Sequence, residues 1–344
     1  MEGLGAERGI ELDGELADVE ALAVLDDLAA AASVAFLVEM DHCIHERHEF
    51  RLLCIRYLAS RGWRWFGEEL DWRMGQRIDR YLVSGDKALL EPVDDGNWYR
   101  SGVLAGTTAD PALTAAMNDE RKRFAESLRR TAPNVRYFGF DVGGGDAEYL
   151  AAANAAATFE DLLPVMAMRE ELMHRRVDQI IDANPGDKVA LMAGSTHLMK
   201  DDRRVSAPGM TPAGGGSVPS IGHHVAHTRG APVLSIWQLH GGGHSASPWL
   251  APTGELVVPE DTINASLAKR WSQPCLALVA PSGPRLRVAQ MNNLVLECAL
   301  DDQADAIIFH PEVTPVRQSA SRSASLASQR DPARSHRAPL RRLQ

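Results

Sequence analysis

Short apolar segments alternate along this chain with longer segments of helical character, and this alternation limits the folds open to it. Residues 33–38 (SVAFLV) are β-branched and aromatic, as in a buried strand, and residues 45–60 after them favour a helix. Further strands are expected at 63–68, 135–140, 188–192, 233–239, 275–280 and 305–309, and further helices at 15–32, 73–90, 110–131, 146–157 and 159–182. This order predicts an α/β fold with a central, mostly parallel sheet flanked by helices, and with helical insertions over the carboxyl ends of the strands.

The chain divides into three parts by composition. Residues 1–32 form an acidic N-terminal segment and helix, whose first 14 residues are expected to be mobile. Residues 33–317 are expected to form a single α/β domain, within which the Gly-, Pro- and Ser-rich stretch 203–220 predicts a long loop that could cover a site. Residues 318–344 are rich in Ser, Ala and Arg, which predicts a disordered basic tail.

Charge and cysteine content exclude several classes of protein. The net charge is −10, and residues 318–344, with six Arg and one Asp, contribute +5, so the rest of the chain carries −15. Such an acidic body argues against a nucleic-acid partner. No apolar stretch is long enough for a spanning helix and no secretory signal is recognisable, so no membrane partner and a cytoplasmic location are expected. The four cysteines form no C-x-x-C pair, which argues against a disulfide scaffold or a cysteine zinc site.

Acids and histidines follow four consecutive predicted strands. These residues are Glu39, Asp41, His42, His45 and Glu46 after the first strand; Glu68, Glu69, Asp71 and Trp72 after the second; Asp141 after the third; and Gly194, Ser195, Thr196 and His197 after the fourth. Open α/β sheets bind ligands at the carboxyl ends of their strands. The sequence therefore predicts a functional rim at this edge, although chance placement on a surface is the alternative.

His42 is the candidate general base of this rim. A histidine titrates near neutrality, so a positioned imidazole can accept a proton from water. Glu39 and Glu46 lie three and four residues away, and a neighbouring carboxylate would fix the ring tautomer. An exposed helix start with ordinary charged residues is the alternative. His45 and His48 continue the spacing, which could bind a metal or belong to a solvated helix face.

Two glycine-containing patterns suggest other chemistries but are incomplete. Residues 240–243 (HGGG) resemble the oxyanion loop of α/β-hydrolases, yet the chain has no G-x-S-x-G nucleophile elbow, and Ser195 lacks the second glycine. A serine hydrolase is therefore not favoured. The Gly-rich runs at 143–145 and 214–216 match neither the phosphate loop nor the dinucleotide fingerprint, so they are interpreted as plain loops.

Taken in order, several short motifs resemble the erythromycin esterase family, which includes proteins labelled as succinoglycan biosynthesis homologues. The motifs are Val38-Glu39-Met40-Asp41-His42-Cys43, Glu69-Leu70-Asp71-Trp72, Gly139-Phe140-Asp141, Arg169-Glu170-Glu171-Leu172-Met173, Gly194-Ser195-Thr196-His197, and the closing Ala306-Ile307-Ile308-Phe309 with Thr314-Pro315. The resemblance spans roughly residues 33–317. It implies a hydrolytic domain that cleaves an ester, in the best-known members a macrolactone, without a covalent intermediate, a required metal or a cofactor.

The resemblance also implies roles for individual residues. His42 would be the general base, and Glu39 and Glu69 would orient His42 or the water. His197 and Arg169 would bind the carbonyl or the developing oxyanion, a role that suits the fixed donor fork of arginine. The positions expected to contact a small-molecule ester substrate are Glu46, Trp72 and Asp141.

The chain departs from the family pattern beside these residues. Val38 and Cys43 stand where the family has glycines that allow close packing around the base, and Gly194 and Ser195 stand where it has a histidine and an asparagine. These departures bear on the macrolide substrate more than on hydrolysis. Two alternatives stay open: a metal-dependent hydrolase with Glu39, His42 and His197 as ligands, and an inactive homologue that binds a hydrophobic ligand.

Overall fold

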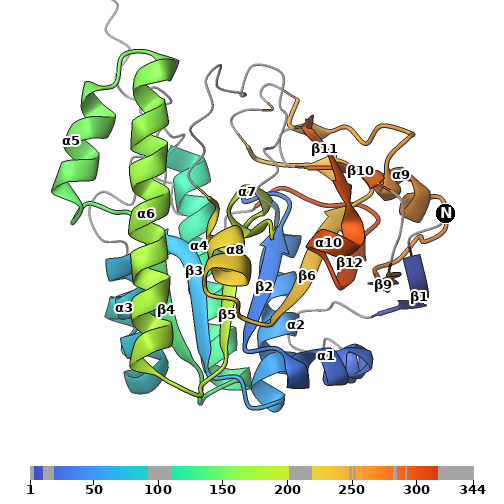
Figure 1. Cartoon of the computed structure of the whole chain (residues 1–344), viewed down its shortest axis with the longest axis horizontal. Helices are drawn as coiled ribbons and strands as arrows, with labels where there is room; N and C mark the ends of the chain where they lie inside the picture. Colours follow the sequence, from blue (N-terminus) through green and yellow to red (C-terminus); the bar gives the residue numbers. More distant parts are fainter. Residues whose placement is uncertain are drawn as a thin grey trace, which may run out of the picture.

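An eight-stranded sheet forms the centre of the structure (Figure 1). The structure is a computed structural model that describes residues 4–10, 19–91, 111–200, 219–247, 250, 253–281, 285–290 and 293–316. The strand order is β1-β9-β12-β6-β2-β5-β3-β4. The bounds are β1 Leu4–Gly9, β2 Val34–Glu39, β3 Trp65–Asp71, β4 Arg136–Asp141, β5 Val189–Gly194, β6 Val233–His240, β9 Cys275–Val279 and β12 Ala306–His310.

The strands from β12 to β4 all run parallel, and only β9 runs in the opposite direction, pairing antiparallel with β12 on one side and with β1 on the other. The predicted α/β fold with a mostly parallel sheet is therefore confirmed. Parallel neighbours end at the same edge of the sheet, so the segments after β2, β3, β4 and β5 meet there. Figure 1 shows α5 (Ala147–Ala155) and the upper part of α6 (Phe159–Ala183) rising beyond this edge.

Helices cover both faces of the sheet, and side chains alternate between the two. Ala35 and Leu37 of β2 pack on the face covered by α2, whereas Val34, Phe36 and Val38 pack on the face covered by α6. The first face carries α1 (Asp26–Ala31), α2 (Glu46–Ser60), α3 (Trp72–Ser84), α4 (Pro111–Thr131) and the 3-10 helices η2 (Val19–Leu25) and η3 (Lys87–Leu90). The second carries α6, α7 (Ser195–Leu198), α8 (Ile221–His223), η4 (His224–Thr228), α9 (Ile263–Ala268) and α10 (Leu300–Gln303).

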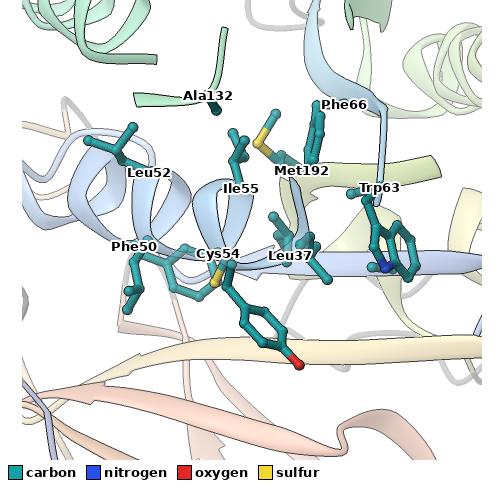
Figure 2. Close-up of a cluster of buried hydrophobic side chains, with 14 of the residues drawn as sticks. Leu37, Phe50, Leu52, Cys54, Ile55, Trp63, Phe66, Ala132 and Met192 are labelled. Carbon is teal, nitrogen blue, oxygen red and sulfur yellow. The ribbon is translucent and has the colours of Figure 1, made fainter. Parts of the chain in front are cut away.

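The α2 helix packs directly on the middle strands. Figure 2 shows Phe50, Cys54 and Ile55 of this helix beside Leu37 of β2 and Met192 of β5, all buried. Burial of this apolar face fixes the position of α2 along the strands. The first turns of α2 consequently lie close to the carboxyl ends of the strands, where the polar residues gather.

Some elements were not expected from the sequence. The first residues, predicted to be mobile, contain β1, which pairs with β9, and Glu7 accepts hydrogen bonds from Arg270 Nη1 (2.7 Å) and Trp271 Nε1 (2.8 Å). A hairpin of β10 (Arg285–Ala289) and β11 (Val295–Ala299) and a small ladder of β7 (Gly243–His244) and β8 (Glu255–Leu256) were also missed.

Other predictions lie outside the described residues. These are the basic tail at 318–344 and nearly all of the loop at 203–220. Within the part of the chain that the structure describes, no helix is both long and apolar enough to cross a bilayer.

Candidate active site

His42 lies between two buried carboxylates at the carboxyl edge of the sheet. Its Nδ1 is 3.2 Å from Glu39 Oε2, and its Nε2 is 3.8 Å from Glu69 Oε2. The imidazole is 19% exposed, so solvent reaches it, whereas Glu39 is fully buried. The first contact is a hydrogen bond, and the second is too long for one. The ring is therefore oriented through Nδ1, and Nε2 is directed toward Glu69.

Two arginines on α2 hold Glu39. Arg47 Nε is 3.3 Å from Glu39 Oε2, and Arg51 Nε donates to Glu39 Oε1. Burial alone would raise the pKa of Glu39, but the charges of Arg51 and Arg47 outweigh it and lower that pKa. An ionised Glu39 only accepts hydrogen bonds, so Nδ1 of His42 is the donor, and it is Nε2 that carries the lone pair whenever the ring is neutral. Arg47 also donates to the backbone oxygen of His42 at 2.7 Å.

The same arginines extend the charged layer to Glu68 on β3. Arg47 Nη2 is 3.2 Å from Glu68 Oε1, Arg51 Nη1 donates to the same oxygen, and the Tyr137 hydroxyl donates to Oε2. Burial would raise the pKa of Glu68, but Arg51 and its neighbours lower it to about 2. This layer was missed in the sequence, because Arg47 and Arg51 stand among other charged residues of α2 and their four-residue spacing does not show which face of the helix is buried.

Glu69 points to the opposite face of the sheet from Glu68. The pairing of β3 with β4 matches Glu68 to Gly139 and Asp71 to Asp141, so β3 has one extra residue between these pairs. Such a bulge redirects side chains at a strand end. Glu69 Oε2 accepts a hydrogen bond from the backbone nitrogen of Gly194 at 3.0 Å, at the end of β5.

Glu69 also joins His42 to a pair of cations. Its Oε1 accepts from Arg169 Nη2 at 2.7 Å and is 3.2 Å from His197 Nε2. Burial would raise the pKa of Glu69, but the charges of His197, His42 and Arg169 hold that pKa well below its usual range. Glu69 is therefore ionised, and one carboxylate connects the candidate base to both cationic groups.

Arg169 and His197 are held by acids on their far sides. Arg169 makes two parallel hydrogen bonds to Asp141, at 2.8 and 2.7 Å, and His197 Nδ1 is bonded to Glu170 Oε1. Burial would lower the pKa of His197, but Glu69 and Glu170 raise it to about 10. Near neutral pH the site thus has a cationic His197 beside the cationic guanidinium.

Of the expected substrate contacts, Asp141 meets the site through Arg169, and the other two lie differently. The two oxygens of Glu46 accept from the backbone nitrogen of Thr314 (2.9 Å) and its hydroxyl (2.8 Å). Trp72 begins α3, and the guanidinium of Arg176 lies 5.7 Å from its ring centroid. Glu46 thus ties α2 to the segment after β12.

The contacts of Glu39, His197 and Ser195 bear on the metal-dependent hydrolase that the sequence left open and on the serine hydrolase that it did not favour. Both oxygens of Glu39 face arginines and His197 lies against Arg169, so a metal bound by Glu39, His42 and His197 would have to displace cations. Among the described residues, no cluster of three or more His, Cys, Asp or Glu has an arrangement that could hold a metal. The hydroxyl of buried Ser195 donates to Gln290 rather than to a histidine, which does not favour a serine nucleophile.

Together these elements define an α/β protein with acids, two histidines and an arginine at the carboxyl edge of a parallel sheet. The structure has an erythromycin esterase-like fold. It is similar to a mutant of the erythromycin esterase EreC in its open conformation, with a TM-score of 0.64 and 16% sequence identity over 90% of this chain and 98% of that one.

Two further solved structures share this architecture. A protein from Bacillus cereus matches with a TM-score of 0.60 and 13% identity, and a succinoglycan biosynthesis protein matches with 0.58 and 12%. Each match covers 91% of this chain and 96% of the other. No protein-family profile matches the sequence, and no curated protein matches it at a significant level. At these identities the likeness establishes the fold.

Proposed function

We propose that this protein is a hydrolase that cleaves an ester by general-base activation of water at His42. The observation that carries the proposal is the pairing of His42 Nδ1 with an ionised, arginine-held Glu39, which leaves Nε2 as an acceptor in a partly exposed ring. A neutral imidazole fixed in this tautomer is suited to accept a proton from water.

The reaction would proceed in two steps. The water oxygen attacks the ester carbonyl carbon while its proton moves to His42 Nε2, and the imidazolium that forms is stabilised by Glu39 and Glu69. The tetrahedral intermediate then expels the alcohol, which takes the proton from His42 Nε2 as the carbon–oxygen bond breaks. The products are a carboxylic acid and an alcohol, and no group on the protein is acylated.

The accessible cations would stabilise the oxyanion. The Arg169 side chain is 19% exposed and that of His197 is 12% exposed, and both contact Glu69 beside His42. Donors fixed before the reaction stabilise developing charge without reorganisation, and one good oxyanion donor contributes about 10²–10³-fold in rate. Asp141 holds the guanidinium from behind, so Arg169 can offer its remaining hydrogens in a constant direction.

The substrate class is proposed from the fold. A macrolide macrolactone is the first candidate, because a structural neighbour is an erythromycin esterase. The departures at Cys43 and Gly194 are the reason to test simpler esters as well. Cys43 is buried against Leu113 and Met117 of α4, so this position packs α4 beside the segment that carries His42.

The experiment is hydrolysis of macrolides of different ring size and of simple aryl esters, followed by mass spectrometry. We expect the mass of one water to be added to at least one ester, and His42→Ala to lower kcat by about 10²–10⁴-fold. His227→Gln changes an exposed histidine on η4 and serves as the matched control, with unchanged turnover. Wild-type rates in folded His42→Ala would contradict the role of His42.

A chelator arm separates this mechanism from the metal-dependent one. Turnover that survives chelation supports direct activation of water by His42. Turnover that is lost in chelator and restored by a divalent ion would favour a metal hydrolase instead. Absence of product from every ester would argue against the proposal and favour a protein that only binds a ligand.

A further inference from the structure

Glu170 carries a half-buried carboxylate whose presence the proposed reaction does not explain. It lies on α6 directly after Arg169, and its side chain is 15% exposed. One oxygen, Oε1, is bonded to His197 Nδ1, whereas Oε2 is buried and has no hydrogen-bond partner among the described residues. A buried carboxylate oxygen without a partner costs stability, so such a group calls for an explanation beyond packing.

The role of Glu170 follows from its contact with the His197 ring. Both nitrogens of this ring face carboxylates. Nδ1 is bonded to Glu170 Oε1, and Nε2 is 3.2 Å from Glu69 Oε1. Ionised carboxylates only accept hydrogen bonds, so an imidazole between two of them is most stable with a proton on each nitrogen. The opposing influence is Arg169 Nη1, which lies 3.3 Å from Nε2.

The balance of charges around His197 favours the cation. Glu69 reaches it from β3, Glu170 and Arg169 reach it from α6, and His42 lies on the other side of Glu69. His174 lies one turn beyond Glu170 on α6, where burial and the nearby His224 lower its pKa, so it adds no strong positive charge near neutral pH. Two carboxylates thus oppose one guanidinium at the ring.

We propose that Glu170 is a positioning residue that keeps both nitrogens of His197 protonated, so that His197 serves as a fixed cation and leaves proton abstraction to His42. The inference rests on the proposed function for its catalytic meaning, but the protonation of His197 can be measured without any substrate. The two histidines beside Glu69 then have opposite roles: His42 accepts a proton, and His197 stays protonated. Nε2 of His42 is 3.8 Å from Glu69, whereas both ring nitrogens of His197 lie within hydrogen-bond distance of a carboxylate oxygen.

The test is a titration of His197 by ¹⁵N NMR in the full chain, with the signal assigned by its loss in His197→Gln. In the wild type we expect both ring nitrogens to remain protonated through neutral pH, with the titration midpoint well above that of an exposed histidine. Glu170→Gln should lower this midpoint by about 1–3 pH units, the effect of removing one adjacent opposite charge. Glu171→Gln, at the next and exposed position of α6, is the matched control and should leave the midpoint unchanged.

Activity adds a second readout. With an ester that the wild type cleaves, Glu170→Gln should move the alkaline limb of the kcat profile down by the same 1–3 units, approximately. The acidic limb of the profile should stay in place. A merely structural role for Glu170 would lower kcat at every pH without moving either limb.

Several outcomes would overturn the inference. One is a wild-type His197 that is already neutral near pH 8, which needs no variant and so decides the matter even if Glu170→Gln does not fold. Another is a midpoint that is unchanged in folded Glu170→Gln. If no ester is hydrolysed but the NMR shifts occur as expected, the proposed function fails while the assignment of Glu170 to His197 stands.

Discussion

Replacement of His240 tests whether buried neutral histidines limit the acid stability of this fold. His240 ends β6 beside His310, which ends β12, and both side chains are buried. Within the described part of the chain, neither ring nitrogen of His240 has a hydrogen-bond partner. Burial lowers the pKa of His240 from 6.5 to about 4, and burial with the nearby His240 lowers that of His310 to about 3.

The magnitude follows from linkage between protonation and folding. Below pH 6.5 His240 is protonated in the unfolded chain but stays neutral in the folded chain. The free energy of unfolding therefore decreases as the pH falls toward the pKa of the folded state. A pKa difference of 2.5 units corresponds to about 3 kcal/mol, most of which is lost by about pH 4.5. Carboxylates with lowered pKa values, such as Glu68, lose their contribution only below pH 4.5, so they do not obscure this window.

The variant is His240→Leu, which removes the titrating group and leaves no unpaired ring nitrogen. At pH 7 we expect unchanged or higher stability, because an apolar side chain of similar size replaces an unsatisfied polar one. Between pH 6.5 and 4.5 we expect urea unfolding to show a loss about 2–3 kcal/mol smaller than in the wild type. His227→Gln, at an exposed position, should follow the wild-type curve. Equal losses in His240→Leu and the wild type would refute the reasoning.

Two further predictions concern the α2 helix. Arg51→Met removes a buried charge that pairs with both Glu39 and Glu68. We expect urea denaturation to show a loss of about 3–5 kcal/mol in the free energy of unfolding, whereas a loss below about 1 kcal/mol would show that the pairing is dispensable. Glu46→Gln weakens the bonds to Thr314 and should cost about 1–2 kcal/mol in stability with KM unchanged. A large rise in KM would instead support Glu46 as a substrate contact, as the sequence predicts.

The central strands could be predicted because their residues are apolar on both faces. After the polar first residues Ser33 and Lys188, the predicted strands 33–38 and 188–192 are continuous apolar runs, as buried parallel strands require, and they match β2 and β5 closely. By contrast, β1 contains Gly, Glu and Arg and is held at the sheet edge by pairing with β9, so its own residues give little strand signal. The β10–β11 hairpin alternates weakly between apolar and polar residues and was overlooked.

The candidate site was only partly predictable. Strand ends located Glu39, His42 and Glu69, because a parallel sheet brings such ends together whatever their distance in sequence. The helix spacing that suggested Glu46 as the partner of His42 was misleading, because α2 begins only at Glu46 and His42 precedes it. The buried arginines of α2 depend on which helix face meets the sheet, and Glu170 depends on the rotation of α6 about its axis. Neither is readable from one sequence.

The bulge in β3 has an evolutionary consequence. Glu68 and Glu69 are consecutive, yet one belongs to the buried arginine layer and the other to the site, so the geometry depends on the length of this strand as well as on its residues. Substitutions can accumulate widely around such a feature, whereas one insertion or deletion would exchange the two carboxylates between the faces of the sheet. Divergence by substitution can therefore leave the positions of Glu68 and Glu69 unchanged. We expect insertions and deletions within β3 to be rare among proteins of this fold.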